Sequence, residues 1–303
     1  IEADEYDNMF HGLRPDIAIV TNVEWDHPDF FRTPDDLVRS FRQFVKLLPW
    51  DGLLIACADD AGAAELAGER RDAGLPVITY GSDHDADWRA LNVRSRSDGT
   101  MGFDLLRRGD RLGAVKLLLP GRHNVLNALA ALVAADRQGV PVSEAIAALR
   151  TFEGTGRRFD LRGEVDGVAV IDDYAHHPTA IRVNLAAAKE RYPDRELWAV
   201  WQPHTYSRTQ ALMDDYRKAF GDADHVLVTD IYAAREQPIA GISTEAVMNG
   251  FAHPDARHTP TLEDTTDVLV REARAPAVIF IMSAGDAPQI GVEFLKRRRE
   301  SAL

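Results

Sequence analysis

Short apolar runs alternate with amphipathic segments along the first half of the chain. The runs "PDIAIVTNV" and "GLLIACADD" predict two strands. The segment between them, "DLVRSFRQFVKLLP", predicts a helix, because its apolar residues share one helical face: Leu37, Phe41, Phe44, Val45 and Leu48. The pattern therefore predicts a β-α-β arrangement.

The pattern changes after "PVITYG". Between Trp88 and Pro120, alternating polar and apolar residues are interrupted by turn residues at Asp98-Gly99 and Gly109-Asp110, which predicts an antiparallel meander. The next segment, "HNVLNALAALVAADRQGV", predicts a helix that stops at Gly139. Its inward positions are Val125, Leu126, Leu129, Leu132 and Val133.

Strands and helices alternate more regularly in the second half. The apolar strands "GVAVIDD", "ELWAVWQ", "HVLVTD" and "AVIFIMS" are separated by helices expected to begin near Pro178, Ser207, Thr244 and Asp264. This spacing predicts a mainly parallel, doubly wound sheet, with ligands bound outside the carboxyl ends of its strands. The stretch "EGTGRR" is the best linker candidate, so we predict an α/β protein with domains at 1–155 and 156–303.

Composition narrows the class of protein. The 303 residues are 45% hydrophobic and 27% charged, without an apolar stretch of the ~18 residues that span a bilayer, so we expect no membrane partner. A net charge of −13 disfavours nucleic acid as a partner. The single cysteine, Cys57, excludes an internal disulfide and favours a core residue. No secretory leader is recognisable, which makes the cytoplasm the expected location.

Four polar stretches follow the predicted strands of the second half, "DDYAHHP", "QPHTYSRT", "DIYAARE" and "SAGD". In the first, two acids, a tyrosine and two histidines precede Pro178, and they either build a site or cap the following helix. In the second, His204 and Arg208 suit a fork for a carboxylate or phosphate. The alternative is a helix capped by Ser207, with Arg208 facing solvent.

The first half offers two weaker candidates. In "NVEWDHPD", Asp26, His27 and Asp29 form either a metal site or a solvated turn. In "GRHNVLN", Asn124 and Asn127 share a helical face, where they either read a purine edge or cap and solvate the helix. The residues alone favour the cap.

Taken together, these stretches resemble the Mur ligases, ATP-dependent enzymes of peptidoglycan synthesis. The matching blocks are "EADEYD", "TNVEWDHPD", "PGRHNVLNALAA", "FEGTGRRFD", "IDDYAHHPTAI", "QPHTYSRT" and "DIYAARE", in the family order. The resemblance implies part of a central ATPase domain followed by a Rossmann-like C-terminal domain. No GxxxxGK[ST] run occurs. We therefore expect this chain to lack the family's phosphate loop and UDP-sugar domain, and not to turn over alone.

The resemblance is closest to members that join L-alanine to UDP-N-acetylmuramate through an acyl phosphate, with ATP and Mg²⁺. It implies Glu2 and His27 as magnesium ligands, with His27 also catalytic. It implies three further residues at the adenine, namely His123, Asn124 and Asn127, which overturns the cap interpretation.

The remaining roles implied by the resemblance lie in the second half. Arg158 matches an arginine beside the nucleotide phosphates, and Asp173 an acid that holds the ribose hydroxyls. Tyr174 and His176 match residues near the incoming amino acid. His204 and Arg208 match residues that hold the muramoyl carboxylate or the alanine. Arg158, His176, His204 and Arg208 are thus the further catalytic candidates.

Two departures from the family pattern bear on these roles. Thr205 stands where many members have another arginine, and Ser283 and Ala287 replace a usual glycine and isoleucine.

Two alternatives for the function of the chain stay open. One is a recycling ligase that adds a tripeptide to UDP-N-acetylmuramate, and the other is a noncatalytic nucleotide-binding module.

Overall fold

The computed structural model describes residues 1–96 and 98–301 and divides them into two compact units. The first unit comprises Ile1–Phe152, and the second begins at Glu153. This division lies three residues before the predicted one, at the first residue of the predicted linker segment, residues 153–158. The assignment of functional domains to 1–155 and 156–303 remains a proposal.

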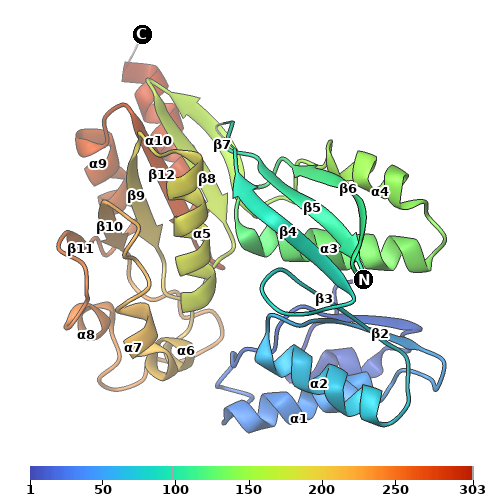
Figure 1. Cartoon of the computed structure of the whole chain (residues 1–303). Helices are drawn as coiled ribbons and strands as arrows, with labels where there is room; N and C mark the ends of the chain where they lie inside the picture. Colours follow the sequence, from blue (N-terminus) through green and yellow to red (C-terminus); the bar gives the residue numbers. More distant parts are fainter. Residues whose placement is uncertain (97, 302–303) are drawn as a thin grey trace. The chain divides into compact units, whose positions relative to one another are not determined.

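The first unit is built on a six-stranded sheet of order β1-β2-β3-β4-β5-β6. Strands β1 to β4 are parallel, and β4, β5 and β6 form the predicted antiparallel meander. Figure 1 shows α1 and α2 on one side of the parallel strands and α3 on the other. The elements are η1 (Tyr6–Gly12), β1 (Ile17–Val20), α1 (Pro34–Val45), β2 (Leu53–Cys57), α2 (Ala61–Asp72), β3 (Val77–Gly81), β4 (Trp88–Ser95), β5 (Met101–Arg107), β6 (Asp110–Leu117), α3 (Arg122–Arg137) and α4 (Val142–Leu149).

The core of the first unit follows the apolar pattern of the sequence. Of the five residues assigned to one face of α1, Leu37, Phe44, Val45 and Leu48 are buried, and Phe41 packs at the edge of the core. Every residue of β2 is buried, including Cys57. The prediction of a core cysteine is confirmed.

The second unit contains a six-stranded sheet of order β11-β10-β9-β12-β8-β7, parallel except for the antiparallel edge strand β7. Figure 1 shows α5 on one face of this sheet and α9 and α10 on the other. The elements are β7 (Asp160–Val165), β8 (Val168–Asp173), α5 (Pro178–Arg191), β9 (Glu196–Trp201), α6 (Tyr206–Ala211), α7 (Met213–Tyr216), β10 (His225–Val228), α8 (Thr244–Met248), β11 (Ala256–His258), α9 (Leu262–Glu272), β12 (Ala277–Met282) and α10 (Pro288–Ser301).

The doubly wound prediction for this half is confirmed, with two differences in detail. Strands β7 and β11 were not predicted. Helix α9 begins two residues before Asp264, because Thr261 and Asp264 form a reciprocal capping box at its start. In the part of the chain that the structure describes, no helix has the length and apolar character needed to cross a membrane.

A histidine links the amino-terminal ends of β9 and β10. His225 Nε2 lies 3.1 Å from Glu196, its Nδ1 lies 2.5 Å from Asp255, and its ring stacks on Trp198. Burial lowers the pKa of His225, but the hydrogen bonds to Asp255 and Glu196 outweigh it and the pKa is raised. Protonation of this imidazole therefore stabilises the second unit.

We expect His225→Gln to flatten the pH dependence of stability. With a raised pKa, the stabilisation is fully present below the usual value of 6.5 and is lost as the pH rises through the folded-state pKa. The wild type should therefore lose thermal stability between about pH 6 and pH 8.5, and the variant should lose less. Thermal unfolding at the two pH values measures this, and equal losses in both proteins would contradict it.

Candidate active site

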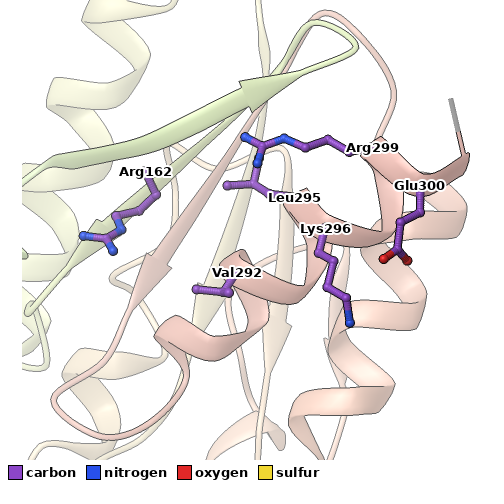
Figure 2. A pocket seen from close by; sticks show the side chains of 6 residues that line it. All are labelled: Arg162, Val292, Leu295, Lys296, Arg299 and Glu300. Atoms are coloured by element: carbon purple, nitrogen blue, oxygen red, sulfur yellow. The ribbon is translucent and has the colours of Figure 1, made fainter. Parts of the chain in front are cut away.

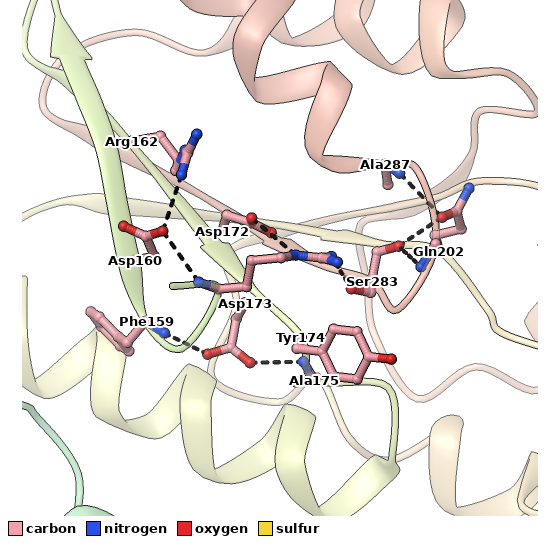
Figure 3. A network of polar contacts seen from close by, with 12 residues as sticks. Phe159, Asp160, Arg162, Asp172, Asp173, Tyr174, Ala175, Gln202, Ser283 and Ala287 are labelled. Atoms are coloured by element: carbon pink, nitrogen blue, oxygen red, sulfur yellow. Dashed lines mark hydrogen bonds and ion pairs between the residues drawn. The ribbon is translucent and has the colours of Figure 1, made fainter. Parts of the chain in front are cut away.

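The register of the second sheet brings the ends of four strands to one level. Met282 of β12 is the partner of both Asp173 in β8 and Trp201 in β9, and Trp201 is the partner of Val228 in β10. The residues that follow these strands therefore emerge together at the carboxyl edge of the sheet, as the sequence predicted. Figure 3 shows the polar contacts at this edge.

Arg157 ties the linker to two of these strand ends. Its Nε donates to Asp172 Oδ2 at 3.3 Å, and its Nη2 donates to the carbonyl oxygen of Ser283 at 2.6 Å. Its guanidinium also lies 5.0 Å from the centre of the Tyr174 ring. Sequence analysis missed this role, although the adjacent arginines of "EGTGRR" were the available signal.

Asp172 and Asp173 are both buried, at 3% and 2% exposure. Burial raises the pKa of Asp172, opposed by the guanidinium of Arg157. Burial raises the pKa of Asp173 to about 6, opposed by hydrogen bonds from the backbone of Phe159 and Ala175. Burial thus disfavours the charged form of both carboxyl groups, and the neighbouring donors offset only part of this effect.

The oxygens of Asp173 already accept bonds within the protein. Oδ2 accepts from the Phe159 amide at 2.7 Å, and Oδ1 accepts from the Ala175 amide at 2.7 Å and from Asn184 Nδ2 at 3.0 Å. In this geometry the carboxylate fixes the linker against the start of α5. Its implied role toward ribose hydroxyls remains a prediction, and it requires the ribose to compete with these three donors.

A second network joins β9 to the loop after β12. Gln202 Oε1 accepts from Ser283 Oγ at 2.7 Å, and Gln202 Nε2 donates to Asp286 at 2.7 Å. A Cβ on Gly285 would lie 2.6 Å from Gln202 Oε1 and 2.8 Å from Tyr232, so only glycine fits there. Ser283, one of the departures from the family pattern, is thus a hydrogen-bonded part of this edge.

His204 and Arg208 are brought together as predicted. Arg208 is 4% exposed, and its Nη1 lies 3.0 Å from His204 Nδ1. Because a guanidinium can only donate, His204 Nδ1 accepts, and a neutral His204 carries its proton on Nε2. The alternative of a Ser207 cap with a solvent-facing Arg208 is wrong, since Ser207 lies inside α6 and its hydroxyl bonds Glu236.

Thr205, which lies between His204 and Arg208 in the sequence, has a strained backbone conformation. Its φ is 65° and its ψ is 147°, a conformation rarely adopted by a β-branched residue. The turn is held by bonds between the backbones of Thr205 and Tyr232 at 2.9 Å and of Tyr232 and Pro203 at 2.8 Å. The turn places His204 just before α6 and Arg208 within it, so that the two side chains meet.

We expect Thr205→Gly to raise stability and lower activity. Relief of about 1–3 kcal/mol of strain exceeds the roughly 1 kcal/mol of extra chain entropy from glycine. The looser turn should lower kcat/KM about tenfold, because His204 and Arg208 are held less firmly. Thermal unfolding and ligase kinetics measure the two effects. Thr205→Val keeps the β-branched strain and should show no gain in stability, so a gain there would contradict the explanation.

Tyr174 and His176 lie beside this pair. The His176 ring is 6.1 Å from the His204 ring and 5.4 Å from the Tyr174 ring, centre to centre. His176 Nδ1 lies 2.9 Å from the carbonyl oxygen of Tyr174. A carbonyl can only accept, so Nδ1 carries the proton, and a neutral ring has its lone pair on Nε2. The neighbouring His177 instead caps α5 by accepting from the Thr179 amide.

Arg158 is exposed at the same edge. Its guanidinium lies 5.4 Å from the Tyr174 ring, on which Arg157 also packs. An exposed guanidinium held over an aromatic ring is suited to a mobile anionic ligand, because the ring orients it without neutralising its charge. The predicted contact with nucleotide phosphates remains a proposal.

The adenine candidates lie at the start of α3 in the first unit. Asn124 Nδ2 donates to the Pro120 carbonyl at 2.8 Å and lies 3.0 Å from His123 Nε2, while Asn127 Nδ2 is 3.4 Å from Asn124 Oδ1. The helix is preceded by Gly121 and has no side-chain cap. The asparagines thus share a face, as predicted, and their contact with adenine stays a prediction.

The metal candidates also lie in the first unit. His27 Nε2 is 3.1 Å from Glu5 and 3.9 Å from Asp26, and the hydrogen bond from His27 lowers the pKa of Glu5. Glu2 is exposed. Among residues 1–96 and 98–301, no group of three or more histidine, cysteine or acidic side chains is arranged to hold a metal.

Of these two side chains, only Glu2 suits Mg²⁺ in the arrangement that the structure shows. Mg²⁺ keeps several waters and is often held by one or two carboxylates together with substrate phosphates. The exposed carboxylate of Glu2 fits that mode. The imidazole of His27 does not fit while it bonds Glu5, so its role as a ligand requires this pair to separate.

Comparison with known proteins identifies the class to which this fold and site belong. Residues 2–135 match the Mur ligase middle domain, and residues 157–285 match the Mur ligase, glutamate ligase domain. The chain belongs to the Mur ligase family.

Particular relatives narrow the similarity. The chain is 42% identical to a UDP-N-acetylmuramate--L-alanine ligase of Pelotomaculum thermopropionicum over 99% of its length and 65% of the relative's. A crystal structure of UDP-N-acetylmuramate-alanine ligase MurC from Thermotoga maritima matches with a TM-score of 0.77 and 25% identity, covering 97% of this chain and 62% of that one. A murein peptide ligase from Psychrobacter arcticus matches with a TM-score of 0.66 and 28% identity, covering 96% and 59%. The chain thus spans less than two thirds of these proteins.

Proposed function

We propose that the chain provides the adenine-binding face and the amino-acid site of an ATP-dependent ligase that joins L-alanine to UDP-N-acetylmuramate. The similarity to enzymes of that name supports the substrates. The observation that carries the proposal is the buried Arg208 beside His204, with Tyr174 and His176 at the same edge. The use of ATP is the reason to propose the cytoplasm as its location.

The reaction has two steps. In the first step, a carboxylate oxygen of the muramoyl group attacks the γ-phosphorus of ATP. The bond from the γ-phosphorus to the bridging oxygen breaks, ADP departs, and an acyl phosphate is formed. The amino nitrogen of L-alanine then attacks the acyl carbon, phosphate leaves, and the nitrogen loses a proton. Both steps bring anions together, so the site must supply positive charge.

The second unit supplies this charge and a proton acceptor. Arg208 and the Nε2–H of His204 can donate to a carboxylate, and Arg208 holds the tautomer of His204 that makes this donation possible. Arg158 would face the phosphates of the nucleotide. With Nδ1 protonated toward the Tyr174 carbonyl oxygen, a neutral His176 would take up the proton released by the amine at Nε2. Tyr174 positions His176 through its carbonyl oxygen.

The first unit supplies groups toward the nucleotide. His123, Asn124 and Asn127 would contact adenine, and Glu2 would hold Mg²⁺, with His27 as a further ligand only after release from Glu5. Mg²⁺, when bound, would reduce the negative charge of the phosphates during transfer.

The test is formation of the amide product. The natural polypeptide that carries residues 1–303 is incubated with ATP, Mg²⁺, UDP-N-acetylmuramate and L-alanine, and product is detected by mass together with released phosphate. ATP-dependent UDP-N-acetylmuramoyl-L-alanine supports the proposal. Absence of this product from a folded, nucleotide-binding protein would overturn it.

A tripeptide-adding ligase is the second candidate, favoured by the similarity to the Psychrobacter peptide ligase. The same assay with a tripeptide in place of L-alanine separates the two. A higher kcat/KM for the tripeptide would assign the second function, while a preference for L-alanine would assign the first.

A further inference from the structure

A hollow of about 400 Å³ lies on the flank of the second unit, between β7 and α10. Figure 2 shows the residues that line it, Arg162 from β7 and Val292, Leu295, Lys296, Arg299 and Glu300 from α10. Helix α10 begins at Pro288, just after the strand ends that form the candidate active site. Arg299 lies about 16 Å further along the helix axis. The hollow is therefore distinct from that site.

The backbone of β7 shapes one wall of this hollow. The register with β8 shifts between Leu161 and Gly163, so Arg162 is the extra residue of a β-bulge, a feature that re-aims a side chain. A Cβ on Gly163 would lie 3.3 Å from Leu295 Cδ1 and 3.5 Å from Arg299 Nη2. Glycine thus lets the Arg299 guanidinium approach the strand that carries Arg162.

The basic side chains of α10 differ in whether an acid pairs with them. Arg297 pairs with Asp267 at 2.5 Å, and Arg298 Nε lies 3.6 Å from Asp166. Inside the hollow, Lys296 Nζ lies 3.6 Å from Glu293 Oε2, whereas Arg299 makes no ion pair with any residue of the described chain, 1–96 and 98–301. Its full charge is available to a ligand.

The lining combines this charge with an apolar surface. Three cations, Arg162, Lys296 and Arg299, and one acid, Glu300, line the hollow in a protein whose net charge is −13. Arg162 Nη1 also donates to Asp160 Oδ2 at 3.1 Å. Val292 is 59% exposed and adds an apolar wall. Guanidinium groups favour the planar, bidentate bonding that phosphate oxygens accept. The volume falls in the range of about 300–1,000 Å³ that is typical of small-molecule sites.

We propose that this hollow binds an organic phosphate, with the phosphate group on Arg299 and on an Arg162 that exchanges its bond to Asp160 for the ligand, and with the less polar part against Val292. The proposal does not depend on the ligase function, because no step of the ligase reaction is assigned to these residues. Arg162 reaches the network of Figure 3 only through its bond to Asp160.

Phenyl phosphate is a suitable probe. Its binding to the protein is followed by titration calorimetry and by backbone amide NMR shifts, with inorganic phosphate as a second ligand. We expect saturable binding of phenyl phosphate that shifts amides of β7 and α10, weaker binding of inorganic phosphate, and at least about a tenfold loss of affinity in the double variant Arg162→Gln, Arg299→Gln.

Two control variants separate this site from others. Arg182→Gln removes an exposed arginine of the same unit that donates to Thr179 Oγ1 at 3.3 Å. Arg158→Gln removes the cation proposed for the ligase phosphates. Both should change the affinity less than about twofold. The proposal is overturned if binding is lost in Arg158→Gln, if it is unchanged in the double variant while thermal unfolding is also unchanged, or if no saturable binding occurs.

Discussion

Replacement of Arg208 by lysine should lower kcat/KM of the ligase reaction by about 100-fold or more. Arg208 is almost fully buried and bonds His204 Nδ1 at 3.0 Å. Lysine keeps the charge but loses the planar fork, so it cannot both hold the tautomer of His204 and donate to a carboxylate. Much of the loss should appear in kcat, because hydrogen-bond donors stabilise the transition state most, where negative charge develops on the reacting groups.

The measurement is steady-state amide formation by the natural polypeptide that carries this sequence. Arg182→Lys is the matched control, since Arg182 is exposed on α5, and its activity should stay within about twofold of wild type. Thermal unfolding of Arg208→Lys shows whether the fold persists. A folded Arg208→Lys protein with nearly wild-type kcat/KM would remove Arg208 from the proposed mechanism.

The main elements could be predicted because their apolar patterns are strong. The strands β8, β9 and β12 each contain a run of at least four apolar residues that is buried, although β9 begins with the exposed Glu196 and β8 ends in two aspartates. The face assigned to α1 is the buried one. Strand β7, "DLRGEV", was not predicted, because it is a bulged edge strand with mostly polar residues. Strand β11 has only three residues, too few to show a period.

The site was predictable where local sequence carries the signal and not where distant residues meet. Placement of His204 and Arg208 after β9 follows from strand order alone. The burial of Arg208 could not be predicted, because the same sequence is compatible with a capped helix and an exposed arginine. Arg157 was missed because its partner, the Ser283 carbonyl, lies 126 residues away in the sequence. Only the register of the folded sheet brings the two together.

Replacement of Asp173 by alanine should lower the free energy of unfolding by about 3 kcal/mol at neutral pH. The carboxylate is 2% exposed, and its loss leaves the amides of Phe159 and Ala175 and the Nδ2 of Asn184 without their acceptor. Asp286→Ala is the matched control, because Asp286 is an exposed acid at the same sheet edge. It should cost less than about 1 kcal/mol.

The pH dependence of this loss gives a second test. The pKa of Asp173 is raised by burial from 3.8 to about 6, so between these values the folded state retains a proton that the unfolded state has released. A rise in pH across this window therefore favours unfolding of the wild type, whereas Asp173→Ala lacks that contribution. The difference in unfolding free energy between the two proteins should be about 2 kcal/mol larger near pH 4 than near pH 7. Urea unfolding at both pH values measures it. A difference that grows toward neutral pH would mean that the three donors, rather than burial, control this carboxylate.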